Sequence, residues 1–378
     1  HYYSVIFDEI NTKVEFTVTE RSSFFKFHFP KTENANIIID AFFKNSEIRV
    51  LPEKNKIIGI ARNNSGGVPE NFANYFVIEF SQPFKKSGVW DGKGNIMLKN
   101  QLKGKHVGAY VSFNTEESDI IQAKVSSSFI SHEQAWRNLK KELPENKNFD
   151  KILEEGRKSW NNELSKIKVE SEDNAYGLSN KIKFYSCFYR TILFPRQFHE
   201  YNAEGEQVHY SPYNGEILEG PLYTDNGFWD TFRAVFPFYT ILYPEKLGEI
   251  MQGIMVNPYK ESGWLPEWSS PGHRDCMIGS NSASIISEAF LKGIKNFDID
   301  TAYDGIINSS ENEGPLSSVG RKGAFEYNKL GYIPFDSSIN ENVARTLEYA
   351  YNDFSIWKLA VELNLSLIHI SEPTRHLD

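Results

Sequence analysis

The sequence predicts a multidomain β + α protein. An N-terminal antiparallel β-sandwich (1–130) is followed by a helical linker (131–170) and by helices that form part of a ring (171–364). Three observations predict this order. Hydrophobic and polar residues alternate in the first third, their spacing changes to three and four near Ser131, and the later connections carry Gly, Pro and Trp. A chain of 378 residues can bury two separate cores.

Alternation with a period of two predicts strands in the first third. In KVEFTVTE, Val14, Phe16 and Val18 fall on one face and polar residues on the other. The segments FFKFHF, NYFVIEF and HVGAYVSF repeat this pattern between Gly, Asn and Pro turns. Several such strands with one buried face indicate an antiparallel sandwich.

A pair of amphipathic helices is predicted next. SHEQAWRNLKKEL begins with Ser131 as its cap and has Glu133 in its first turn. NFDKILEEGRKSWNNELSKI places Phe149, Ile152 and Trp160 on one helical stripe. We interpret this pair as the linker between the two domains.

Helices dominate the rest of the chain. Helical spacing occurs in NKIKFYSCFYRTILF, FWDTFRAVFPFYTILY, PEKLGEIMQGIM, SASIISEAFLKGIK and SINENVARTLEYAYNDFSIWKLAVELN. Consecutive helices with alternating short and long connections are typical of αα-hairpins in a ring. The loops at one end of such a ring are expected to form a pocket.

Composition excludes some classes of function. The net charge is −9 and the acidic residues are scattered, whereas nucleic-acid binding needs a basic stripe. No apolar run is long enough to span a membrane. Cys187 and Cys276 lack metal-site spacing, and no signal peptide follows His1, so a leader was removed or the start is missing.

The C-terminal segment 365–378 does not match the rest of the chain. Its string LSLIHISEPTR resembles the translation of a transposase-type sequencing adapter. The alternative is a native strand and turn, since Leu367, Ile368 and Ile370 favour strands. We leave the segment out of the fold prediction and expect the native sequence to stop near Asn364.

Two motifs carry candidate ligand-binding groups. In YTDNGFWDTFRAVFP, Asp230 offers two acceptor oxygens and Trp229 a flat apolar face, a combination that suits a sugar. The alternative is a capped helix with a buried Trp and an Asp–Arg pair. In GWLPEWSSPGHRDC, Arg274 could donate two parallel hydrogen bonds, with Asp275 fixing its fork and His273 donating to a ligand oxygen.

Glu267 has two possible roles. A carboxyl group between Trp264 and Trp268 could have its pKa raised by desolvation, as a general acid requires. Glycoside hydrolysis needs a second carboxylate, however, and no spacing nominates Asp304 or Glu348 for it. The motif alone therefore leaves open whether Glu267 is an acid or part of the pocket wall.

Taken together, the segments resemble glycoside hydrolase family 92, the calcium-dependent, inverting exo-α-mannosidases. The resemblance covers nearly all of the chain before Leu365 and rests on YYSV, TERSSFFKFHFP, FYRTILFPRQF, YTDNGFWDTFRAVFP, LYPEKLGEIMQGI, ESGWLPEWSSPGHRDCMIG and VARTLEYAYNDF, in family order. It implies a β-sandwich, a helical linker and an (α/α)6 toroid, here partial. It also implies a mannose-containing oligosaccharide or glycan as substrate, and export to the periplasm, cell surface or medium.

The resemblance further assigns the site residues. The residues that would contact the mannose are Trp229, Asp230, His273, Arg274 and Asp275, with Glu267 and Trp268 in the pocket wall. The family's general acid, calcium ligands and general base lie in Glu-Gly-Asn, Gly-Asn-Glu-Pro and Gly-Asp-Glu-Asp motifs, and none of these occurs here. We therefore expect the catalytic residues and Ca²⁺ ligands beyond Asn364, and this chain alone to be inactive.

The chain departs from the family pattern at one loop, and two other functions are alternatives to a mannosidase. Where many family members carry a tryptophan in a sandwich loop, this chain has Gly67, Val68 and Pro69, which leaves the preferred α-linkage open. A sugar-binding protein without hydrolysis, or a glycoside phosphorylase, would also combine a sandwich with helices.

Overall fold

A computed structural model describes residues 1–365. Residues 366–378, nearly all of the segment expected to derive from an adapter, lie outside the described part. The chain folds into two compact units. The sandwich unit comprises 1–66, 71–168 and 201–205, and the helical unit comprises 67–70, 169–200 and the chain from 206. The finer division of the sequence into four segments stays a prediction.

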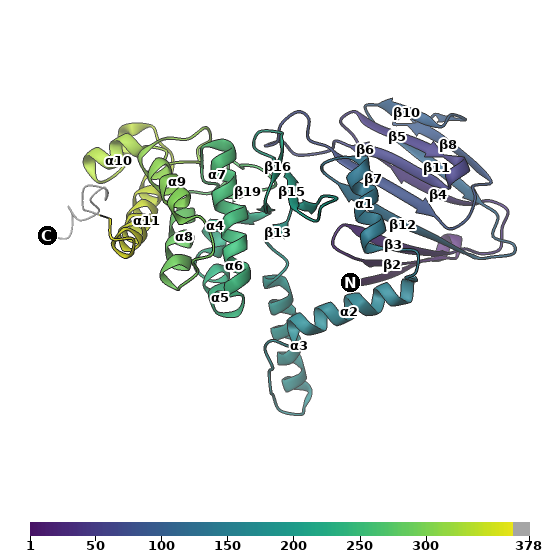
Figure 1. Cartoon of the computed structure of the whole chain (residues 1–378), viewed down its shortest axis with the longest axis horizontal. Coiled ribbons are helices and arrows are strands. Elements are labelled where there is room, and N and C mark those ends of the chain that lie inside the picture. Colours follow the sequence, from purple (N-terminus) through teal and green to yellow (C-terminus); the bar gives the residue numbers. More distant parts are fainter. Residues whose placement is uncertain (366–378) are drawn as a thin grey trace. The chain divides into compact units, whose positions relative to one another are not determined.

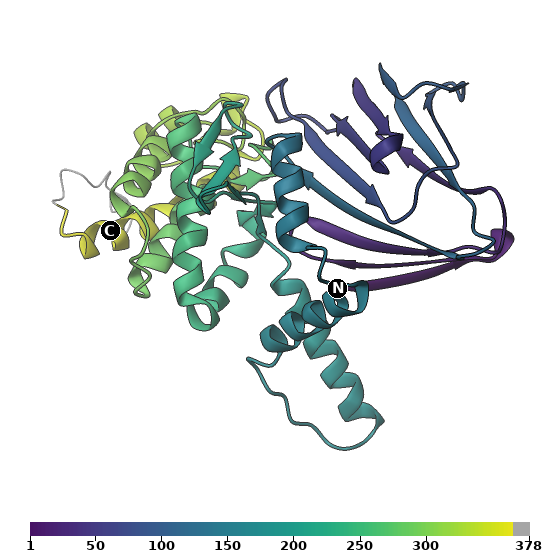
Figure 2. The same cartoon turned by 45° about the vertical axis from the view of Figure 1, so that its right-hand side comes forward.

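The sandwich unit contains two antiparallel sheets, as the alternation predicts. The eight-stranded sheet has the order β1 (Tyr2–Phe7), β2 (Thr12–Val18), β3 (Ser22–His28), β12 (Ile120–Ser128), β7 (Asn74–Phe80), β6 (Lys56–Ala61), β5 (Ser46–Leu51) and β10 (Gln101–Gly104). The four-stranded sheet has the order β4 (Ala35–Asp40), β11 (Val107–Phe113), β8 (Lys86–Asp91) and β9 (Ile96–Met97). Figures 1 and 2 show these strands side by side.

The core of this unit lies between the two sheets. Ile57 and Ile121 of the large sheet pack in one cluster with Val89 and Val111 of the small sheet, and all four are fully buried. The register places Phe16 opposite Phe25, with ring centroids 5.0 Å apart. Period-two alternation thus identifies the strands. It does not give the buried face of β2 in full, because Val18 is 37% exposed and Thr17, expected on the polar face, is fully buried.

Two helices cover the outer face of the large sheet. In α1 (His132–Glu142), the Ser131 hydroxyl caps the helix by accepting from the Gln134 N–H at 3.0 Å. Leu139 of α1 packs against Val77, and Phe149 of α2 (Phe149–Leu164) packs against Phe24. The helices expected to act as a linker thus bury their apolar stripes on the sandwich.

In the described part of the helical unit, α3 is followed by eight further α-helices. Their bounds are α3 (Ala175–Thr191), α4 (Phe228–Thr231), α5 (Val235–Leu242), α6 (Pro244–Met251), α7 (Asn257–Ser262), α8 (Asn281–Leu291), α9 (Ile299–Glu311), α10 (Ala324–Leu330) and α11 (Asn342–Glu362). Short strands lie between them: β13 (Arg196–Gln197), β14 (Glu200–Tyr201), β15 (Gln207–Tyr210), β16 (Ile217–Glu219), β17 (Tyr223–Thr224), β18 (Asn226–Gly227) and β19 (Trp268–Ser269). The described helices form part of a toroid and do not close into a ring.

The core of the helical unit joins α4–α9 to α11. Phe236 of α5, Ile254, Ile286 of α8 and Leu359 of α11 are buried in one cluster. The single helix expected for FWDTFRAVFPFYTILY is instead two, α4 and α5, separated at 232–234. The break has a physical reason, because it places Pro237 in the first turn of α5, where its missing N–H is not needed.

Candidate functional site

Backbone pairing brings the two predicted motifs together in the helical unit. Strand β18 pairs antiparallel with β19, and the Phe228 N–H donates to the Glu267 carbonyl at 3.0 Å. Gly227 is required at this contact, because a Cβ there would lie 2.8 Å from the Trp268 ring. The first turn of α4 is thus held beside the Trp268 segment, although the two are far apart in sequence.

Trp229 is fixed at this junction by two charged side chains. Its indole Nε1–H donates to Glu348 Oε1 of α11 at 3.3 Å, and the Arg233 guanidinium lies 4.7 Å from the ring centroid. Arg233 also approaches Glu348 at 4.0 Å. The Asp–Arg pair considered as the alternative is therefore replaced by an Arg233–Glu348 pair.

Asp230 remains available to a ligand. Its side chain is exposed and makes no hydrogen bond or ion pair with another residue in 1–365. Its two oxygens can accept from neighbouring hydroxyl groups beside the Trp229 face.

His273 presents an acceptor. Its Nε2 lies 3.0 Å from the Ser262 hydroxyl, which itself donates to the Pro258 carbonyl at 2.7 Å, so the imidazole N–H resides on Nε2. Nδ1 is buried and has no partner among the described residues. Burial lowers the pKa of His273 to about 4, which keeps the ring neutral at ordinary pH. In this tautomer Nδ1 carries a lone pair, and the contact of His273 with a sugar stays a prediction.

Arg274 and Asp275 are held by neighbouring segments. The Arg274 N–H donates to the Trp268 carbonyl at 2.9 Å, and the Arg274 carbonyl accepts from Ser318 Oγ at 2.7 Å. The carboxylate of Asp275 accepts from Ser317 Oγ at 2.7 Å. The backbone of the His-Arg-Asp motif is therefore tied both to β19 and to the chain before α10.

The loop 67–70 belongs to the helical unit and passes beside Arg274. Gly67 has φ +69°, and a Cβ there would lie 2.8 Å from the His273 carbonyl oxygen and 3.2 Å from Arg274 Nη1. The glycine at this departure from the family pattern therefore permits close packing of the loop on the motif.

Glu267 is a buried carboxyl group at the N-terminus of α8. It is 4% exposed and accepts from the Ser282 hydroxyl and from the Ser282 N–H at 3.2–3.3 Å. Desolvation raises the pKa of Glu267 to about 8, against the opposing effect of these donors and of Arg321. This geometry favours the wall role over an acid facing solvent, and its contribution to substrate binding stays a prediction.

A buried polar network supports the same end of α8. Arg321 pairs with Asp353 of α11 at 2.6 Å and donates to Ser280 Oγ at 3.2 Å. Asp353 also accepts from the Tyr327 hydroxyl at 2.9 Å. Arg321 is 1% exposed and lies inside the unit, where Asp353 and Ser280 hold its guanidinium.

The arrangement gathers most of the predicted residues. Trp229 and Asp230 lie in α4, directly after the β18–β19 pair that contains Trp268. His273 forms a bridge with Ser269, and the Arg274 N–H donates to the Trp268 carbonyl. The group missed from the sequence is Glu348, since a single acidic residue in a helical run gives no sign that it meets an indole from a distant helix.

Within 1–365, no three His, Cys, Asp or Glu side chains are grouped so that they could hold a metal ion. No described helix is long and apolar enough to cross a membrane.

Comparison with known proteins covers nearly the whole chain. The family model for the glycosyl hydrolase family 92 N-terminal domain matches residues 1–128, and that for the family 92 catalytic domain matches 134–368. A curated relative described as an uncharacterized secreted glycosidase of Arthroderma benhamiae is 28% identical over 265 residues, 66% of this chain and 29% of its own length.

Solved structures agree with these matches. The inverting family GH92 mannosidase BT2199 of Bacteroides thetaiotaomicron is 40% identical with a TM-score of 0.92, over 98% of this chain and 49% of that one. The α-mannosidase BT3965 of the same organism, solved with mannoimidazole, is 26% identical with a TM-score of 0.83, over 96% of this chain and 47% of that one. The chain therefore spans about half the length of these solved relatives. It belongs to glycoside hydrolase family 92.

Proposed function

We propose that the whole protein to which this chain contributes is an exo-acting α-mannosidase that removes terminal mannose from glycans with inversion. The observation that supports the proposal is the pairing of β18 with β19, which joins the segment before Trp229 and Asp230 to the segment before His273 and Arg274. A mannosidase described as inverting, and another solved with mannoimidazole, are the relatives that support the sugar class.

The side chains divide the binding task by chemistry. Trp229 offers an apolar face to the C–H side of a pyranose ring, and Asp230 accepts from its hydroxyl groups. His273 Nδ1 accepts from another hydroxyl, while Arg274 donates. A terminal pyranose has several hydroxyl groups and an apolar C–H face, which match these acceptors, this donor and the flat indole face.

Turnover requires two further carboxyl groups. In an inverting glycosidase, one carboxylic acid protonates the leaving oxygen and a carboxylate on the opposite face activates water. The motifs that supply both groups in the family do not occur in this sequence. We therefore propose that this chain alone binds the sugar without hydrolysing it.

The calcium dependence and the location are proposals for the whole protein. We expect any Ca²⁺ ligands to lie outside the described residues, and we expect the protein to be exported, as the relative described as secreted supports.

A turnover assay tests the proposal. The whole protein should release free mannose from manno-oligosaccharides. NMR should show that the first mannose released has the anomeric configuration opposite to that of the bond cleaved. A chelator should stop the release. The 378-residue chain should release none. Phosphate-dependent formation of mannose 1-phosphate, or binding without release by the whole protein, would contradict the mannosidase proposal.

A further inference from the structure

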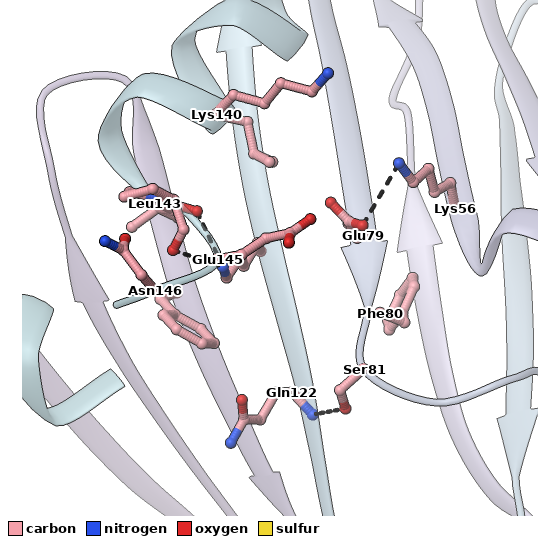
Figure 3. A pocket seen from close by; sticks show the side chains of 13 residues that line it. Lys56, Glu79, Phe80, Ser81, Gln122, Lys140, Leu143, Glu145 and Asn146 are labelled. Carbon is pink, nitrogen blue, oxygen red and sulfur yellow. Dashed lines mark hydrogen bonds and ion pairs between the residues drawn. The ribbon is translucent and has the colours of Figure 1, made fainter. Parts of the chain in front are cut away.

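A polar hollow lies on the outer face of the large sheet, wholly inside the sandwich unit. It has a volume of about 800 Å³ and opens between β7, β12 and the connection from α1 to α2. Figure 3 shows Lys140, Glu145 and Asn146 on the helical side, with Glu79 and Gln122 on the sheet side. Ligand pockets in proteins are commonly about 300–1,000 Å³, so the size suits a small molecule or a segment of a longer one.

The helical wall of this hollow is fastened to the sheet. The Lys124 ammonium of β12 donates to the carbonyls of Leu143 and Pro144, at 2.9 and 3.4 Å. The same ammonium lies 5.3 Å from the centroid of the Phe24 ring. Because these contacts hold the connection between α1 and α2 in place, a ligand would not have to order this wall on binding.

The remaining charges of the sheet side are also engaged. Lys56 pairs with Glu79 at 3.5 Å and lies 4.3 Å from the centroid of the Trp136 ring. Lys56 and Lys124 therefore already have partners, and neither is left as a bare cation for an anionic ligand.

Five polar groups of the lining can still bond to a ligand. They are the amides of Gln122 and Asn146, the hydroxyl hydrogen of Ser81, the carboxylate of Glu145 and the ammonium of Lys140. They supply donors and acceptors in similar numbers, and the charges of Lys140 and Glu145 offset each other. A neutral ligand with many hydroxyl groups matches this set.

A second hollow continues across the same connection. It has a volume of about 680 Å³ and shares Glu145 and Asn146 with the first. Its charges are likewise partnered in part, with Asp150 paired to Lys26 at 3.1 Å. A ligand that bonds to Glu145 and Asn146 can thus extend to either side, as a chain of sugar rings would.

Other ligand classes fit less well. An anion would need unpartnered cations in excess of carboxylates. Lys56, Lys124 and Lys147 have partners among residues 1–365, which leaves Lys140 and Lys151, and Glu145 and Glu154 line the same hollows. An apolar ligand would need an exposed apolar floor, yet Phe24 and Leu143 are 3% and 2% exposed. We propose that these hollows form an oligosaccharide-binding site on the sandwich, separate from the candidate site of the helical unit and additional to the proposed function.

The test is a calorimetric titration of mannotriose into the 378-residue chain. An Asp230→Ala background disables the candidate site, so that failure of the proposed function and failure of this site can be told apart. Glu145→Ala/Asn146→Ala removes the two exposed side chains that both hollows share. The matched control is Asn100→Ala/Glu117→Ala, which removes the same two side-chain types, also exposed, from elsewhere on the sandwich unit. Circular dichroism checks that each variant is folded.

We expect mannotriose to bind in the Asp230→Ala background and to bind at least about tenfold more weakly after the Glu145→Ala/Asn146→Ala change, as loss of two or three ligand hydrogen bonds implies. The control should bind as the background does, and inorganic phosphate should not bind. Unchanged affinity in the Glu145→Ala/Asn146→Ala variant, absence of binding in the folded background protein, or preferential binding of phosphate would each overturn the proposal.

Discussion

Replacement of Glu267 by glutamine tests whether its carboxyl group is a neutral buried acid. In the folded chain, desolvation raises the pKa of Glu267 to about 8 from an ordinary value of 4.5. Between these two values the folded state holds a proton that the unfolded state has lost. The stability from this proton is therefore complete below pH 4.5 and is lost as the pH rises through 8.

The size of the effect follows from the shift. At about 1.4 kcal/mol for each pKa unit, Glu267 should lower the free energy of unfolding of the helical unit by about 3 kcal/mol between pH 5 and pH 8. Glutamine keeps a carbonyl oxygen for the Ser282 N–H and cannot ionise, so the variant should lack this loss.

The assay is urea unfolding at several pH values, followed by tryptophan fluorescence. The quantity to compare is the difference in the free energy of unfolding between Glu267→Gln and the unaltered chain. This difference cancels the contribution of His273, which changes with pH in the opposite sense. The pKa of His273 is lowered to about 4, so its contribution is present above pH 6.5 and is lost as the pH falls through 4. Glu311→Gln, at an exposed glutamate in α9, is the matched control.

The variant should gain stability relative to the unaltered chain as the pH rises, and the control should not. A difference that stays constant from pH 5 to pH 8 would show that Glu267 titrates normally or is ionised when folded. That result would refute the role assigned here to its burial.

Three further predictions concern the candidate site. Gly227→Ala should destabilise the helical unit by about 1–3 kcal/mol, seen as a lower Tm, because the added methyl group meets the Trp268 ring at 2.8 Å; an unchanged Tm would contradict that packing. Mannose binding should weaken as the pH falls through about 4, where His273 Nδ1 gains a proton and ceases to accept, and His273→Ala should remove this pH dependence. Glu348→Ala should shift the fluorescence of Trp229 and weaken mannose binding by about tenfold. Glu348→Gln should keep most of the original fluorescence and affinity, because its amide oxygen can accept from the indole N–H. Equal effects of the two variants would argue against the hydrogen bond.

The sequence predicts the order of strands and helices because apolar residues recur with the period of each element. Alternation identifies the strands around Phe16 and Phe25, and the serine at 131 and the stripe at Phe149 identify α1 and α2. Helix α9 was not predicted, since its segment IDTAYDGIINSSE is largely polar. The capping Asp298, whose side chain accepts from the Thr301 N–H at 3.1 Å, was the signal that could have found it.

The candidate site is harder to predict because its contacts join distant segments. Motif spacing nominates Trp229, Asp230 and Arg274, but it carries no information on which helix lies against the indole. It likewise carries no information on the pairing of Arg321 with Asp353 of α11, which lies inside the unit. Long-range pairing of charges in a core is set by the packing of whole helices, which local patterns do not encode.

The central claim, that the two motifs form one mannose pocket, is tested most directly by titrating mannoimidazole into the chain in the Glu145→Ala/Asn146→Ala background. We expect binding that Asp230→Ala and Arg274→Ala each weaken by at least about tenfold, with both variants still folded. Equal affinity in the background protein and in both variants would contradict it.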